Sequence, residues 1–191
     1  MALHNQMPGK KLSVKFIIFI GLPVLAIILS LALGWVSVYS GSDASYVGDV
    51  PIFSLTGIGF NSPVFKAATS DQNSAVKAAI TSAFGIDAGK ANAVDINNII
   101  MLSDISILMY LIPLLYLIYV ILILKKPSKM VSYGYKFSLA VLILSILFLI
   151  IVLPSNQNTN IMLYASGAPL VTLILSGVHW VMCIFEKARI A

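Results

Sequence analysis

His179 and Cys183 are the residues of this chain whose types and spacing most suggest chemistry. They are four positions apart, so on a helix their side chains share one face. Imidazole and thiolate both bind metals, and a histidine can also hold a haem iron or pass protons. Two side chains do not complete a zinc site, and the only other histidine, His4, lies in the N-terminal tail. Two interpretations of His179 stay open: an interfacial polar residue that bonds to a neighbouring helix, or a functional polar residue that would need ligands from a partner chain to bind a cofactor. We expect no metal or cofactor held by this chain alone.

Asp104 is the second candidate, because it is the only carboxylate inside a long apolar run. Acidic residues within membrane spans are usually functional. The apolar run begins at Ile99, so Asp104 lies only about five residues, or ~8 Å, into a helix that starts there. Two interpretations stay open: a functional acid, or a hydrated or capped carboxylate that faces the segment outside the membrane.

Other chemical motifs are missing from the sequence. We find no glycine-rich phosphate loop, no His-Glu-x-x-His pattern and no nucleophile with its base, so we predict no catalytic residues and no enzyme. The net charge of +5 does not indicate nucleic-acid binding, because the basic residues lie beside apolar runs and form no stripe with aromatics. A single cysteine excludes an intrachain disulfide.

The elements that position these candidates are four long apolar runs. Of the 191 residues, 59% are hydrophobic and 10% charged, against about 25% charged in an average soluble domain. About 20 apolar residues cross a ~30 Å hydrocarbon layer as a helix. The sequence therefore predicts transmembrane helices over residues 16–39, 95–124, 137–153 and 161–185.

The segments between these runs predict the orientation. Nine of the twelve Lys and Arg residues fall in the tail 1–15, the loop 125–136 and the C-terminus 186–191. Residues 40–94 hold the other three, and the short loop 154–160 holds none. Because basic loops stay on the cytoplasmic side, we expect a protein of the cell membrane with both termini in the cytoplasm. Residues 40–94 and 154–160 then lie outside.

Residues 40–94 are polar and too long for a structureless connector. Within them, apolar residues at helical spacing follow Ser70, a possible N-cap, and Gly85 can end that helix. The predicted fold class is therefore all-α: an integral membrane four-helix bundle with a small, mainly helical extracytoplasmic cap between the first and second spans.

Small residues indicate where the helices touch, since apolar helices gain little from burial in lipid. The first and fourth spans each carry three small residues at intervals of four. We predict that these two faces line the bundle interior and pack together. The third span has mainly bulky residues, so we expect it to be the most exposed to lipid. The predicted helix-packing residues are Ala26, Ser30, Gly34, Ala168, Thr172 and Ser176.

The layout, with a long first outside loop and short later ones, resembles the tetraspan arrangement of claudin-like families. Their Trp-Gly-Leu-Trp and paired-cysteine signature is absent, because residues 40–94 contain neither Trp nor Cys. We therefore assign no family on this resemblance.

Three functional hypotheses follow. The first is a non-enzymatic multi-pass membrane protein that acts as a scaffold or accessory subunit of a membrane complex. Its expected partners are the lipid bilayer and other membrane protein subunits or further copies of itself, with no nucleic acid. The alternatives are a small channel or transporter protomer that works as an oligomer, and an electron-transfer-complex subunit that contributes His179.

Overall fold

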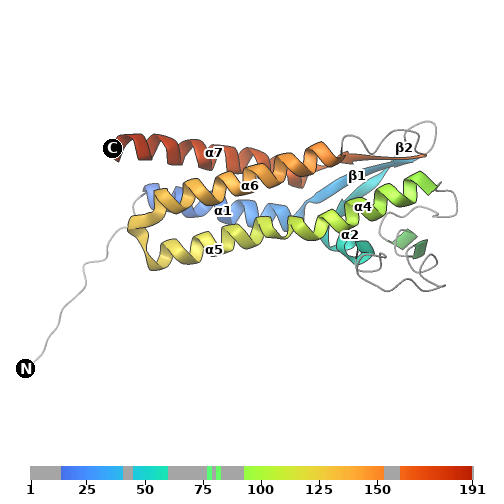
Figure 1. The fold of residues 1–191 in the computed structure, drawn as a ribbon, viewed down its shortest axis with the longest axis horizontal. Helices are drawn as coiled ribbons and strands as arrows, with labels where there is room; N and C mark the ends of the chain where they lie inside the picture. Colours follow the sequence, from blue (N-terminus) through green and yellow to red (C-terminus); the bar gives the residue numbers. More distant parts are fainter. Residues whose placement is uncertain are drawn as a thin grey trace, which may run out of the picture.

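Long apolar helices lie side by side in the computed structural model, and a small sheet extends the bundle at one end (Figure 1). The structure describes residues 14–40, 45–59, 77–78, 81–82, 93–152 and 160–190. Within these residues, four helical segments are long and apolar enough to cross a membrane. They are α1 (Val14–Ala32), α4 (Ala93–Met109) continued by α5 (Leu111–Lys125), α6 (Met130–Val152) with the preceding 3-10 helix η1 (Pro127–Lys129), and α7 (Gly167–Ile190).

The second span consists of two helices because of one proline. Pro113 lies in the first turn of α5, where its missing N–H and its ring disturb a continuous helix. The chain makes a turn at Tyr110, whose N–H donates to the carbonyl of Ile107 at 3.3 Å. The helical direction then resumes, so Asp95–Lys125 of α4 and α5 form one 31-residue candidate span.

A three-stranded antiparallel sheet follows the C-terminal end of α1. Its strands are β1 (Gly34–Ser40), β2 (Ser45–Pro51) and β3 (Ile161–Ala165), in the order β2-β1-β3. Alternate residues of β1 and β3 are buried, as expected for a sheet with one face on a core. The buried side chains of the sheet are Trp35, Val36 and Val38 of β1, Val50 of β2, and Ile161 and Leu163 of β3.

This sheet corrects the all-α prediction. The predicted first helix, 16–39, ends at Ala32, and its last residues form β1. The predicted fourth helix, 161–185, begins as β3, and its helical part starts at Gly167. The physical reason is long-range pairing: Val38 of β1 lies opposite Leu163 of β3. A partner that distant leaves no mark in the local apolar pattern.

The buried face of the sheet shares one core with α2 (Ile52–Gly59) and α4. Ile52 and Leu55 of α2 and Ile99 and Leu102 of α4 are fully buried in it. In Figure 1, α2 and the start of α4 lie beside the sheet, at the end opposite the C-terminus. Of the predicted cap helix over 70–85, residues 77–78 and 81–82 are helical, and its remaining residues lie outside the described ones.

In the bundle, α7 packs against both α1 and α6, and α5 packs against α1 and α6. Lys15 near the start of α1 and Glu186 near the end of α7 form an ion pair of 2.8 Å. The expectation that the third span is the most exposed is wrong, because the smallest share of buried residues belongs to α1. Small residues on α6, described below, account for its close packing.

Candidate functional site

A cluster of aromatic and polar side chains surrounds His179 inside the bundle. His179 is fully buried on α7, near Cys183 one turn further along. Its ring lies edge-on to that of Phe19 of α1, with centroids 5.6 Å apart. From α5, the rings of Tyr119 and Tyr116 approach it at 5.2 and 6.0 Å. Side chains of α1 and α5 therefore pack around this histidine of α7.

Gly134 of α6 closes the cluster from the fourth side. A Cβ atom built on Gly134 would lie 2.7 Å from Cys183 Sγ, 3.2 Å from the Tyr119 hydroxyl and 3.3 Å from His179 Nε2. These three atoms therefore lie around one point, where only a glycine leaves room for them. A side chain at this position would meet the thiol at a separation that real contacts do not show.

Several polar atoms of the cluster are buried without a hydrogen-bond partner among the described residues. They are the hydroxyls of Tyr116 and Tyr119 and both ring nitrogens of His179. Such atoms are rare in folded proteins because each costs about 1–3 kcal/mol of desolvation. An imidazole, a thiol and two phenols thus form a polar site within an apolar bundle, with unused capacity to donate and accept hydrogen bonds.

The cluster lacks the ligands for a metal ion. Among the described residues, no three His, Cys, Asp or Glu side chains come close enough together to hold one. His179 and Cys183 supply two donors, whereas structural zinc takes four and catalytic zinc three. A metal or haem here would therefore need donors from outside the part of the chain that the structure describes.

Asp104 lies away from this cluster, on the other half of the second span. It is partly buried on α4, and it interacts with other groups of the protein. The structure does not bring it together with His179, which belongs to the half of the bundle nearer the C-terminus. The two candidate residues therefore do not form a common site.

Asp95, which sequence analysis did not select, has a clear structural contact. It is 1% exposed, and its carboxylate accepts a hydrogen bond from the backbone N–H of Ile161 at 3.1 Å. This bond joins the first turn of α4 to the first residue of β3, 66 positions apart. An acidic residue just before an apolar run was the available signal.

The predicted packing residues lie in the core with one exception. Five of them are fully buried, on two helices that pack against each other: Ala26, Ser30, Ala168, Thr172 and Ser176. Gly34 belongs to β1, where a Cβ atom would lie 2.5 Å from the Cβ of Asp49. Its small size allows close approach of β2, and the expected helix–helix contact at this residue is wrong.

Sequence analysis missed the small residues of α6. Gly134, Ser138 and Ser145 are buried on one face of this helix. The Ser145 hydroxyl lies 3.2 Å from that of Thr172 on α7, and each hydroxyl also donates to a backbone carbonyl of its own helix. Spacings of four and seven were visible in the sequence, but the abundant Leu and Ile between them obscured the pattern.

Three tyrosines form a row across the exposed face of the sheet. Tyr46 of β2, Tyr39 of β1 and Tyr164 of β3 come from adjacent strands, and both neighbouring ring pairs have centroids 5.4 Å apart. Tyr46 is 58% exposed and Tyr164 44%. The pKa of Tyr46 is raised, first by desolvation and then by the negative charge of Asp49 and the hydrogen bond to it. The three rings of this tyrosine row therefore form a continuous aromatic surface across the sheet.

Fold and sites together define a small helical protein with four candidate membrane spans and a three-stranded sheet at one end. Comparison of the chain with protein-family models, curated proteins and solved structures finds no match.

Proposed function

We propose that this chain is a non-enzymatic multi-pass membrane protein that serves as a scaffold or accessory subunit and binds a partner membrane protein through the tyrosine row. The observation that carries the proposal is the row itself, three aromatic rings on one exposed sheet face. Tyrosine is enriched at protein interfaces, because a rigid ring buries much apolar area while its hydroxyl still finds a hydrogen bond.

The anchoring of the sheet supports a role in presenting this surface. β1 follows α1 almost directly, and β3 is followed by α7 after Ser166 alone. The Ser166 N–H donates to the Trp35 carbonyl at 3.0 Å, and the indole N–H of Trp35 donates to the Ser30 carbonyl at 2.6 Å. The row is thus held by short connections to two helices, which favours a preformed binding surface.

The bundle interior favours this role over transport. Large side chains fill it along its length, including Phe19, Tyr116 and Tyr119 in one half and Trp35 and Phe148 in the other. The rings of Trp35 and Phe148 meet edge-on at 5.1 Å. A channel or transporter made from this chain would therefore need its path between copies, rather than through one bundle.

The proposal places the protein in the cell membrane with the sheet outside and both termini in the cytoplasm. Its basis is the excess of Lys and Arg at the end of the bundle that contains Lys15, η1 and Arg189. The 19 residues of α1 span about 28 Å, close to the ~30 Å of a hydrocarbon layer. β1 follows the helix at that point, so the sheet begins where the layer ends.

Site-specific photocrosslinking in native membranes tests the proposal. A crosslinking amino acid at Tyr164 should give a discrete adduct with a partner protein, and one at the lipid-exposed Val178 of α7 should not. Y39S/Y46S should abolish the Tyr164 adduct, whereas Phe53→Ser, which removes another exposed aromatic of this end, should leave it. A folded protein that gives no Tyr164 adduct, or one insensitive to Y39S/Y46S, would reject the tyrosine row as the interface.

A further inference from the structure

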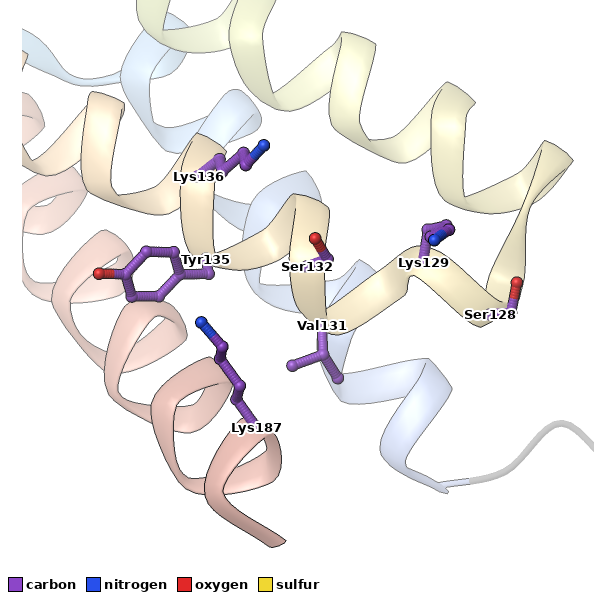
Figure 2. Close-up of a pocket in the computed structure, with 7 residues that line it drawn as sticks. All are labelled: Ser128, Lys129, Val131, Ser132, Tyr135, Lys136 and Lys187. Carbon is purple, nitrogen blue, oxygen red and sulfur yellow. The ribbon is translucent and has the colours of Figure 1, made fainter. Parts of the chain in front are cut away.

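A basic cavity of about 460 Å³ lies at the end of the bundle where α7 ends. It lies between the start of α6, with η1, and the end of α7 (Figure 2). Three lysines, three hydroxyl-bearing residues and one valine line it: Ser128, Lys129, Val131, Ser132, Tyr135, Lys136 and Lys187. No carboxylate is among them. Figure 2 shows Lys187 reaching from α7 toward Tyr135 of α6.

The positive charge of this cavity is not neutralised within the described residues. The aspartates among the described residues are Asp49 of β2 and Asp95 and Asp104 of α4, and none of them belongs to the segments that form this end. The remaining acid, Glu186, is paired with Lys15 at 2.8 Å. Lys187 lies over the Tyr135 ring, 5.4 Å from its centroid, a contact that orients the ammonium group but leaves its charge. The cavity is therefore suited to an anion.

An apolar neighbour of the cavity indicates what kind of anion fits. A second cavity of about 440 Å³ is lined by Ile184 and Ala188 of α7 together with Tyr135 and Lys187, which both cavities share. Next to Ile184, Phe185 is 71% exposed on a helix suited to a membrane. The basic cavity thus continues into an apolar helix surface, an arrangement that matches a charged head group joined to an acyl chain.

We propose that this basic cavity binds the head group of an anionic phospholipid, with its acyl chains along the apolar face of α7. Lysine ammonium groups contact the phosphate, and the serine and tyrosine hydroxyls donate hydrogen bonds to its oxygens. The site is independent of the tyrosine row, which lies at the opposite end of the molecule.

Native mass spectrometry of the purified full-length protein tests this, with dioleoyl phosphatidylglycerol and dioleoyl phosphatidylcholine as probes. Wild type should retain one phosphatidylglycerol with at least about tenfold preference over phosphatidylcholine. K136Q/K187Q should lose that preference. K125Q/K126Q removes the same charge from lysines of the same end that do not line the cavity, and it should retain the preference. K136R/K187R, which keeps the charge, should also retain it.

Three results would overturn the proposal. Wild type without a preference for phosphatidylglycerol would exclude the site. An equal loss in K136Q/K187Q and K125Q/K126Q would show only diffuse attraction to a basic surface. Inorganic phosphate would be the ligand of the cavity if it displaced the lipid at the same phosphate concentration at which it binds the lipid-free protein. Unchanged melting temperature of K136Q/K187Q separates loss of binding from loss of fold.

Discussion

Tyr119 and His179 meet ring to edge inside the bundle, 5.2 Å between centroids, and neither side chain uses its polar atoms within the described structure. Apolar packing therefore holds the imidazole in place, and hydrogen bonds do not. The ring packing of His179 contributes to the stability of the bundle, whereas its two ring nitrogens make no hydrogen bond among the described residues.

The first prediction is that His179→Leu preserves or raises stability. Leucine is similar in size and leaves no buried nitrogen without a partner, so the melting temperature in detergent should not fall, and a gain of about 1 kcal/mol is expected. Thr172→Val is the contrasting variant, because the Thr172 hydroxyl is hydrogen-bonded to Ser145 and to its own helix, and it should lower stability. A clear loss in His179→Leu would mean that the imidazole makes stabilising hydrogen bonds in the membrane.

The second prediction concerns two glycines in neighbouring helices. Gly134→Ala should destabilise the bundle by about 1–3 kcal/mol, because its methyl group would lie 2.7 Å from Cys183 Sγ. Gly177→Ala should be neutral or stabilising, since its nearest neighbour, Leu142 Cδ1, is 3.8 Å away and alanine favours a helix.

Unfolding in detergent, followed by tryptophan fluorescence, measures both glycine variants. Adding Cys183→Ala to Gly134→Ala removes the closest contact and should recover part of the loss. If Gly134→Ala were as stable as Gly177→Ala, the close approach of α6 to α7 at this point would be incorrect.

The third prediction tests the link between α4 and the sheet. Asp95→Ala leaves the buried N–H of Ile161 without this acceptor and should cost about 1–3 kcal/mol. Asp95→Asn keeps an acceptor oxygen and should cost less. Hydrogen exchange at the Ile161 amide should accelerate in the order wild type, Asn, Ala. Equal exchange in all three would show that the carboxylate does not hold β3.

The fourth prediction is the orientation. Cys183, the only cysteine, is buried, so an impermeant maleimide should label wild type poorly on intact cells. Ser45→Cys, at the exposed start of β2, should be labelled from outside, whereas Ser128→Cys, exposed in η1, should react only after the cells are opened. The opposite pattern would invert the topology and put the basic cavity on the outer surface.

The helical part of the fold could be predicted because it follows from apolar length. The strands could not be predicted in this way, and the residues of β1 show why. Residues beyond Ala32 are still apolar and uncharged, as a continuing helix would be. What makes them a strand is pairing with residues 161–165, which bury Val36 and Val38 from more than 120 positions away. Local sequence contains the β-branched residues but not their partner.

For the candidate sites, sequence analysis found His179 but not its surroundings. Tyr116 and Tyr119 were visible as aromatics of the second span, yet their approach to His179 depends on how α5 packs against α1 and α6 within the bundle. Gly134 lies at the beginning of a helix dominated by bulky residues, and its role follows only from the three atoms around it. The tyrosine row depends equally on strand register, since Tyr39 lies opposite Tyr46 only in the folded sheet.

The central position of β1 has a consequence for how the protein is made. One neighbour, β2, is synthesised immediately after it, but the other, β3, emerges about 120 residues later, after two further spans. At ~5–20 residues per second, that interval lasts about 6–24 seconds. Throughout it, one edge of β1 has no strand to pair with and α1 has no α7 beside it. A nascent chain released or truncated before residue 161 therefore presents an open strand edge on β1, and only the synthesis of β3 and α7 completes the sheet and the bundle.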